Sequence, residues 1–243
     1  MRALLYPPAL FVLTMFYGLR VILAALVFRI PNRPGGVYDR AARDWSKAQL
    51  RVAGVRVETA GLERVPRHAP VVYVSNHQSW FDILSLAATI QGRVRFVSKI
   101  ELLKVPVLGA AMYRAGHIFL DRQNRSKAFG AYESAAEVIR AGMSAVVFAE
   151  GTRSRTGELL PFKKGPFVLA IAAGVPVIPV YCGGTFHILP KGSVFIRPRP
   201  VRLYFGEPIP TAGLSYDQRE AVLRQARQVI EQFKRDAAPL DAE

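Results

Sequence analysis

The feature that most constrains the fold is an alternation of short apolar runs with segments of helical length, beginning near residue 54. Gly and Pro residues mark many of the junctions between these segments. The expected strands lie at 55–61, 70–75, 94–99, 117–122, 144–150, 175–182 and, broken by prolines, 194–209. The expected helices lie at 80–90, 126–142, 166–174 and 216–236. This order predicts an α/β fold with a mixed, mostly parallel sheet flanked by helices.

The N-terminal thirty residues form the most apolar part of the chain. Residues 3–19 carry no charge, and the apolar run continues beyond Arg20 to residue 28. A helix over about 9–28 would be about 30 Å long, enough to cross a bilayer, but Arg20 near its middle would cost about 2.5–3.5 kcal/mol. Pro7 and Pro8 are expected to break the helix early. We therefore expect a shallow or re-entrant helix; a single crossing or a buried core helix is the alternative.

The next segment, 37–54, is predicted to form a basic amphipathic helix in which Trp45 contacts lipid headgroups. Arginines crowd the region after the first helix, which places the rest of the chain in the cytoplasm. The expected organisation is a membrane-associated helical motif at 1–54 and one larger domain at 55–243. The protein would lie at the cytoplasmic face of the inner membrane, monotopic or with a single span through residues 1–30.

The net charge of +15 and the pI of about 10.4 predict an anionic partner. The arginines are dispersed and flank apolar segments, whereas nucleic-acid modules usually show a basic stripe or a known motif. The charge therefore favours a membrane surface and phosphate and argues against nucleic acid, with a general bias of composition towards arginine as the alternative. A single cysteine and four histidines without ligand spacing indicate no metal site.

Polar side chains follow several expected strands, where functional loops of such sheets lie. The stretch "NHQSWFD" at 76–82 follows the strand at 70–75. On one continuous helix, His77 and Asp82 would lie roughly 140° apart, so they can pair only if His77 is on a loop and Asp82 begins the helix. Ser79 and Asp82 also fit a capping box. On spacing alone, Asp82 is either a partner for His77 or a helix cap, and both interpretations stay open.

Four sequence blocks resemble those of the glycerolipid acyltransferases, specifically the bacterial 1-acylglycerol-3-phosphate acyltransferases. They occur in the family's order, together with a K-x-E-L stretch at 99–102 and "PFKKGPF" at 161–167. Ala149 and Pro166 depart from the family pattern, which has Pro and Ala there. The four blocks are "NHQSWFD" (76–82), "GHIFLDR" (116–122), "FAEGTR" (148–153) and "VPVIPV" (175–180).

The resemblance implies that an acyl group passes from a thioester directly to a substrate hydroxyl, without a serine nucleophile. His77 fits as the general base, and Asp82 would orient its ring and stabilise the imidazolium. The acyl donor would be acyl-CoA or acyl carrier protein, with no other cofactor. Cationic side chains suit a phosphate on the acceptor. The residues expected to bind the acceptor phosphate are Lys99, Arg122, Glu150, Gly151, Thr152 and Arg153.

The acceptor that the resemblance favours is 1-acylglycerol 3-phosphate, which gives phosphatidic acid. Another lysolipid, such as lyso-ornithine lipid, is an alternative acceptor. A basic lipid-binding protein without catalysis is the alternative outside the enzymes. The strand at 175–180 is expected to shape an acyl channel, and His117 to be a packed side chain.

Overall fold

A computed structural model describes residues 2–121 and 125–241; for residues 125–129, 131 and 238–241 it describes the backbone only. Its centre is one seven-stranded sheet in the order β1-β7-β6-β2-β5-β3-β4. Only the β6–β7 pair is antiparallel, so the expected mixed, mostly parallel sheet is confirmed. The strands are β1 (Val57–Ala60), β2 (Val72–Ser75), β3 (Val94–Lys99), β4 (Ile118–Leu120), β5 (Ser144–Phe148), β6 (Val177–Gly183) and β7 (Val201–Phe205).

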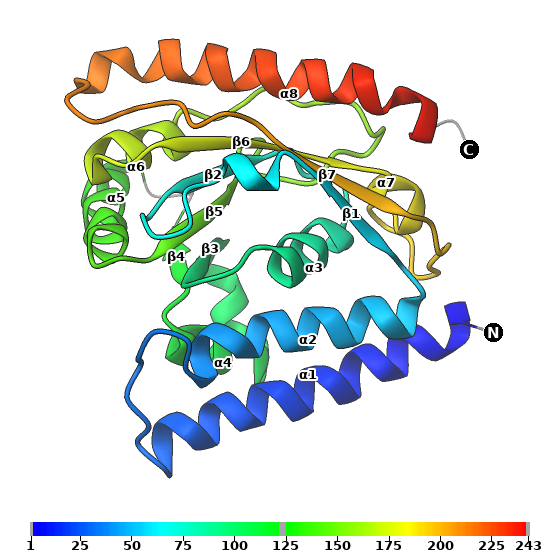
Figure 1. The fold of residues 1–243 in the computed structure, drawn as a ribbon. Coiled ribbons are helices and arrows are strands. Elements are labelled where there is room, and N and C mark those ends of the chain that lie inside the picture. Colours follow the sequence, from blue (N-terminus) through cyan, green and yellow to red (C-terminus); the bar gives the residue numbers. More distant parts are fainter. Residues whose placement is uncertain (1, 122–124, 242–243) are drawn as a thin grey trace.

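Helices cover both faces of this sheet (Figure 1). One face carries α5 (Arg125–Arg140), α6 (Gly165–Ala173) and α8 (Arg219–Asp241) over a core that includes Val74, Val147 and Leu169. The other face carries α3 (Trp80–Thr89), with α2 (Val37–Ala53) and α1 (Arg2–Leu26) outside it. The remaining elements are α4 (Leu108–Ala115), α7 (Thr185–Ile188) and the 3-10 helices η1 (Leu62–Arg64), η2 (Ile100–Lys104) and η3 (Tyr216–Gln218).

The last expected strand is shorter than its sequence suggested. Of the range 194–209, only Val201–Phe205 pairs as a strand with both neighbours, and Val177–Ile209 forms an isolated bridge. Pro198 and Pro200 have no backbone N–H to give to a ladder, so the segment before β7 stays irregular. The segment from 190 to 200 is therefore a loop, and Lys191 near its start lines the main cavity of the protein.

The first helix runs through both prolines, so the expected early break is wrong. Pro7 and Pro8 lie inside α1, where each removes only one backbone donor. Tertiary contacts hold this turn in place, because the buried ring of Tyr6 packs 5.5 Å from that of Phe81 in α3. Further along, a side chain at Gly18 would meet Val107 at 2.6 Å, so glycine allows α1 to approach the start of α4.

The second helix faces the body of the protein with its tryptophan. Trp45 meets Trp80 edge to face at 5.9 Å and donates a hydrogen bond to Thr14 of α1 at 3.2 Å. The ring of Trp45 therefore turns towards α1 and α3 and lines a cavity between the helices and the sheet, and its expected contact with lipid headgroups stays a prediction. A buried ion pair from Arg95 of β3 to Asp39, at 2.7 Å, ties the start of α2 to the sheet.

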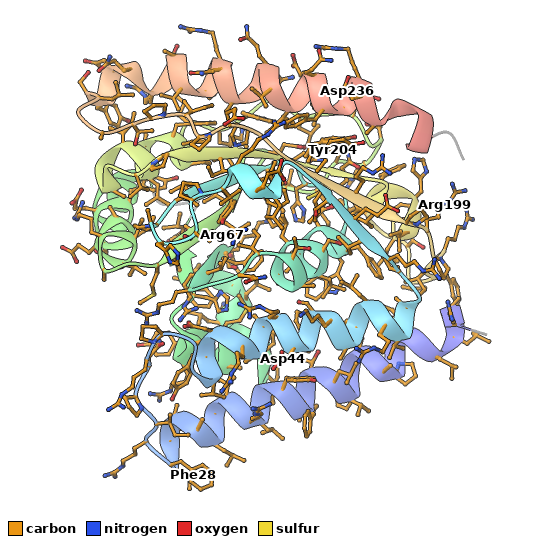
Figure 2. All side chains as sticks on the ribbon, in the orientation of Figure 1. Phe28, Asp44, Arg67, Arg199, Tyr204 and Asp236 are labelled. Carbon is orange, nitrogen blue, oxygen red and sulfur yellow. The ribbon has the colours of Figure 1, made fainter. Side chains whose placement is uncertain are left out.

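Within the described part of the chain, α1 is the one helix long and apolar enough to cross a membrane, by length and composition alone. Much of its outer face is apolar and exposed, and Phe28 points away from the body just beyond its end (Figure 2). Exposed apolar side chains of η2 and α4 lie on the neighbouring surface, since α4 packs on α1. The exposed residues are Leu4, Leu5, Phe11, Val12, Phe16, Leu19, Leu23, Leu26, Val27, Phe28, Ile30, Ile100, Leu103, Val105 and Tyr113.

Candidate active site

The loop after β2 begins with Asn76, whose side chain makes the two hydrogen bonds to β6 that a strand backbone would make. The Asn76 side chain accepts the backbone N–H of Cys182 at 2.7 Å and donates to the carbonyl of the same residue at 3.2 Å. It thereby continues the pairing with β6 by one position while the backbone turns away. The chain can then place His77 on a loop above the sheet and begin α3 three residues later.

The structure brings His77 and Asp82 together, with His77 Nδ1 and Asp82 Oδ2 2.8 Å apart. The same carboxylate oxygen accepts the backbone N–H groups of Gln78 at 2.7 Å and Ser79 at 2.8 Å, and the capping box is complete. The other oxygen accepts the hydroxyl of Thr185 at 2.5 Å. Capping the helix and orienting the histidine are therefore two roles of one fully buried carboxylate, not alternatives.

Both the imidazole and the backbone of His77 are held in place by neighbouring residues. Asp82 binds Nδ1, and the ring stacks on Phe148 with centroids 3.9 Å apart. The backbone is fixed as well, since the N–H of His77 donates to Glu150 at 3.0 Å and its carbonyl accepts from Ser154 at 2.8 Å. With the proton on Nδ1 facing the carboxylate, Nε2 is left as an acceptor. The side chain is 14% exposed, so a substrate hydroxyl can reach it.

Glu150 lies beneath the loop and does not line the cavity. Its two carboxylate oxygens accept the backbone N–H groups of His77 and Leu160, and the residue is buried. Burial raises the pKa of Glu150 to about 7, with the nearby charge of Asp82 acting in the same direction. The sequence analysis placed Glu150 among the phosphate contacts, but both of its oxygens accept backbone N–H groups outside the cavity, so the structure gives it the role of holding His77 in place.

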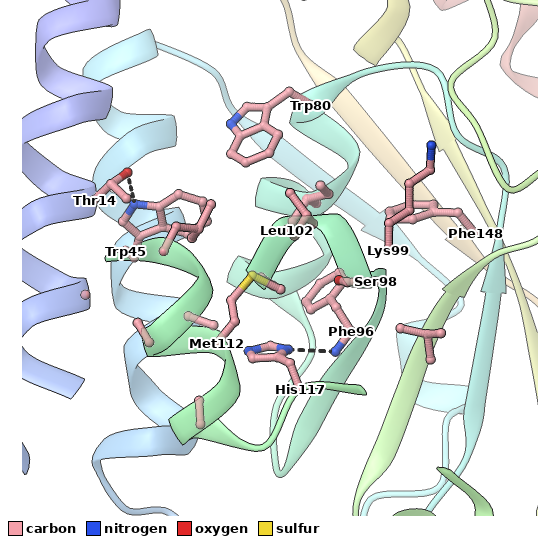
Figure 3. A pocket seen from close by; sticks show the side chains of 18 of the residues that line it. Thr14, Trp45, Trp80, Phe96, Ser98, Lys99, Leu102, Met112, His117 and Phe148 are labelled. Atoms are coloured by element: carbon pink, nitrogen blue, oxygen red, sulfur yellow. Dashed lines mark hydrogen bonds between the residues drawn. The ribbon is translucent and has the colours of Figure 1, made fainter. Parts of the chain in front are cut away.

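A cavity of about 420 Å³ opens at His77 and extends between the sheet and α1, α2 and α4. Lys99 and Phe148 lie on one side of it and Trp45 and Thr14 on the other (Figure 3). Polar groups concentrate near His77, where Gly151, Thr152 and Arg153 also line the cavity. The rest of the wall is mainly apolar and includes Val21, Ile83, Phe96, Leu102, Leu108 and Met112. The site therefore joins a polar, cationic mouth to an apolar interior.

Three cations line this cavity: Lys99, Arg153 and Lys191. None of them forms an ion pair with a carboxylate among the residues that the structure describes, so their charges are available to an anion. Gly151, at φ 72°, makes the left-handed turn that places Thr152 and Arg153 beside His77.

Arg122, the remaining expected phosphate contact, lies outside the described residues. Among those that are described, no three His, Cys, Asp or Glu side chains are grouped so as to hold a metal ion.

Two residues of the site were missed by the sequence analysis, and both belong to the segment around α7. Thr185 donates to Asp82, and Lys191 donates to the Thr152 hydroxyl at 3.0 Å and the Arg153 carbonyl at 3.4 Å. Between them, the carbonyl of Leu189 accepts the Ser79 hydroxyl at 2.8 Å. This segment thus links the histidine–aspartate pair to the cationic loop. No local pattern pointed to these contacts, although Lys191 is a lone cation shortly after an expected strand.

The strand of the fourth block has a different place from the one expected. Residues 177–180 belong to β6, which is buried along its whole length, and none of them lines the cavity. In the sheet, β2 and β5 separate β6 from β3, whose residues do line the cavity. The expectation of a core strand is confirmed, and the strand does not line this cavity, so a role in shaping an acyl channel gains no support.

Comparisons with known proteins place this geometry in a family. The family profile described as Acyltransferase matches residues 56–183. The 1-acyl-sn-glycerol-3-phosphate acyltransferase of Haemophilus influenzae is 37% identical over 170 residues, covering 70% of this chain and 69% of the relative. The alpha enzyme of the same name from Homo sapiens is 34% identical, and the chloroplastic enzyme BAT2 of Brassica napus is 39% identical. The matches cover 72% and 63% of this chain, and the chain spans 62% and 45% of those two relatives.

The fold comparison agrees with the sequence comparisons. The crystal structure of the 1-acyl-sn-glycerophosphate acyltransferase PlsC from Thermotoga maritima matches with a TM-score of 0.77 and 29% identity. That match covers 96% of this chain and 98% of the solved one, so it includes the N-terminal helices as well as the sheet. With its sheet, its His77–Asp82 pair and these matches, the chain belongs to the acyltransferase family.

Proposed function

We propose that the protein transfers a fatty acyl group from a thioester to the free hydroxyl of 1-acylglycerol 3-phosphate, giving phosphatidic acid. The observation that carries this proposal is the position of the His77–Asp82 pair, where a cationic mouth meets an apolar cavity. The phosphate headgroup of a lysolipid matches the cationic mouth, and the long acyl chain of a thioester matches the apolar cavity.

In the proposed reaction, Nε2 of His77 takes the proton of the acceptor hydroxyl as its oxygen attacks the thioester carbonyl. The new ester bond forms as the carbon–sulfur bond breaks, and the leaving thiolate takes the proton back from the imidazolium. Asp82 keeps Nδ1 protonated and stabilises the imidazolium between the two steps. A positioned base of this kind contributes roughly 10²- to 10⁴-fold. The donor, acyl-CoA or acyl carrier protein, enters as a substrate, and no further cofactor is proposed.

The acceptor phosphate would be held by Lys99, Arg153 and Lys191, with the Thr152 hydroxyl beside them. Arg122 stays a proposed contact on the resemblance of its block. Each charged hydrogen bond to phosphate contributes roughly 1.5–3 kcal/mol. Lys191 gives the cluster a rigid member, because its ammonium already rests on the loop that carries Thr152 and Arg153.

We further propose that the protein is monotopic at the cytoplasmic face of the inner membrane. Both ends of α1 pack on the body, with Tyr6 against Phe81 near the start and Val21 clustered with Tyr38 near the end. A helix that crossed the bilayer would have to leave these contacts. Lying flat, α1 can bury its exposed apolar side chains in one leaflet while the cavity opens to lipids that stay in the membrane.

The test is an acceptor panel for the purified protein with one radiolabelled acyl donor. The panel contains 1-acylglycerol 3-phosphate, lyso-ornithine lipid and a lysolipid with a zwitterionic headgroup. We expect label in phosphatidic acid, with the other two acceptors slower by at least tenfold. Faster transfer to lyso-ornithine lipid would replace the proposed acceptor, and no transfer to any acceptor would leave the non-catalytic lipid-binding alternative.

A further inference from the structure

One polar group faces the apolar part of the cavity and has no role in the proposed reaction. His117 lies between α4 and β4, and its ring lines the cavity beside Met112 and Phe96. Nδ1 accepts the backbone N–H of Phe96 at 2.9 Å (Figure 3). A nitrogen that accepts carries no proton, so the proton of the neutral ring is on Nε2.

The ring stays neutral at working pH. Burial lowers the pKa of His117 to about 3, and the nearby charge of Arg95 lowers it further in the same direction. His117 therefore presents one fixed N–H donor, and pH does not exchange it for an acceptor.

This N–H group has no hydrogen-bond partner among the residues that the structure describes. The apolar residues Val21, Ala111, Met112 and Ala115 line the same cavity. His117 is partly exposed and lines the cavity, so water or a ligand in the cavity can reach this donor. A ligand that reaches this part of the cavity can gain by presenting an oxygen to it.

The register of the sheet indicates how far His117 lies from His77, the proposed general base, along the strand direction. Phe96, whose N–H binds the ring, is level with Val146 of β5, which is level with Tyr73 of β2. The strand β2 ends at Ser75, and the ring of His77 stacks on Phe148, which lies two residues beyond Val146, about 7 Å along the strand at roughly 3.3 Å per residue. An extended chain advances about 3.6 Å for every three backbone bonds, so a chain that starts at His77 needs at least about six bonds to reach this level.

We propose that His117 forms a hydrogen-bonding subsite for an acyl chain that carries an oxygen substituent away from the thioester. The substituent is a hydroxyl, keto or epoxide oxygen at least about six carbons from the thioester. This inference rests on the proposed function, because it takes the chain in the cavity to be that of the acyl donor. His117 then sets which chains the enzyme prefers without taking part in acyl transfer itself.

The test compares acyl-CoA donors of one length that differ in the place of the hydroxyl. Stearoyl-CoA is compared with its 3-hydroxy, 10-hydroxy, 12-hydroxy and 16-hydroxy derivatives, using the full-length protein and 1-acylglycerol 3-phosphate. In the wild type, we expect kcat/KM relative to stearoyl-CoA to be highest for one of the three deep positions, 10, 12 or 16, and lower for the other two and for the 3-hydroxy chain. If a hydroxyl at carbon 10, 12 or 16 lowered kcat/KM relative to stearoyl-CoA by the same factor, the proposal would be overturned by the wild-type protein alone.

Two substitutions separate the hydrogen bond from the shape of the cavity. His117→Phe keeps a ring and removes the donor, and we expect it to lower the relative kcat/KM for the preferred hydroxyl position roughly threefold to tenfold. His117→Gln can accept from Phe96 and donate into the cavity, so it should retain the preference. Met112→Leu, which changes the neighbouring wall without a donor, should leave the relative values within twofold.

The outcomes also separate this inference from the proposed function. Unchanged relative values in an active His117→Phe protein would refute the subsite and leave the acyltransferase proposal standing. If His117→Phe does not fold, loss of the preference in a folded His117→Gln protein refutes the subsite in its place. If the wild type transfers no acyl group from stearoyl-CoA, the proposed function itself fails and the inference fails with it.

Discussion

Replacing Asp82 by asparagine is the change that separates the two roles of this carboxylate. Asn can place its carbonyl oxygen where Oδ2 accepts from Gln78 and Ser79, and asparagine caps helices about as well as aspartate. Its amide can face Thr185, whose hydroxyl turns to accept. Asp82→Asn thus keeps the helix cap and the shape of the site, and it removes the negative charge beside His77.

The expected effect on stability follows from the hydrogen bonds. A charged hydrogen bond contributes about 1.5–3 kcal/mol and a neutral one about 0.5–1.5 kcal/mol, a difference of about 1 kcal/mol for each bond. For the three partners at Oδ2 this gives about 3 kcal/mol, reduced because a charge is no longer buried. A loss of that size lowers the Tm of a chain of this length by about 6–12 °C and leaves it folded. Asp82→Ala would leave four hydrogen-bond donors without an acceptor, at about 1–3 kcal/mol each. A loss of activity in that variant could not be separated from a loss of stability.

The expected effect on activity is far larger, because the imidazolium loses its stabilising charge. The equivalent change in serine hydrolases lowers kcat about 10⁴-fold, and we expect a fall of roughly 10³- to 10⁴-fold here. Thr185→Val is the matched control, since it removes one hydrogen bond to Asp82 without touching His77 and should lower kcat tenfold at most. The assay is transfer of a radiolabelled acyl group to 1-acylglycerol 3-phosphate, with Tm measured by circular dichroism. Asp82→Asn activity within tenfold of the wild type would refute the orienting role and leave only the cap.

His77→Ala should abolish nearly all transfer, by 10²-fold or more, while the protein stays folded; activity within threefold of the wild type would contradict a general base. Arg153→Ala should raise the KM for 1-acylglycerol 3-phosphate about tenfold or more with little change in the KM for the acyl donor, and an equal loss with a phosphate-free acceptor would contradict a phosphate contact. Because the folded pKa of Glu150 is about 7 against an ordinary value of 4.5, this group should lower the free energy of unfolding, by up to about 3 kcal/mol, as pH rises from 4.5 to about 7. Glu150→Gln should flatten that part of the pH profile in urea titrations, and an unchanged slope would argue against the raised pKa. A cysteine at Ala3, with Cys182 replaced, should resist a membrane-impermeant maleimide added outside intact cells; efficient labelling would favour a single span.

Part of the site was predictable because its residues signal locally. A buried strand followed by a polar loop and a capping pattern placed His77 before the start of α3 and Asp82 in its first turn. Both residues lie within six positions, so short-range geometry alone could bring them together. Gly151 and Arg153 also carry a local signal, since they follow β5, the strand beside β2 in the sheet.

Other parts depended on contacts between distant positions. Glu150 reaches the backbone of His77, Thr185 reaches Asp82, and Lys191 reaches Thr152, across 73, 103 and 39 residues of sequence. No periodicity or spacing reports such contacts, and so Glu150 was assigned to phosphate while Thr185 and Lys191 were missed.

The sequence by itself determined the kind of fold, because apolar runs with period two or 3.6 can bury their side chains only as strands and helices of an α/β sheet. It also determined which chemical groups stand at the carboxyl ends of those strands. Only the tertiary structure decided that α1 continues through Pro7 and Pro8, since packing of Tyr6 on Phe81 outweighs two missing donors. It likewise turned Trp45 inward and left the N–H of His117 facing the cavity, because each outcome depends on which distant surfaces meet and not on local propensity.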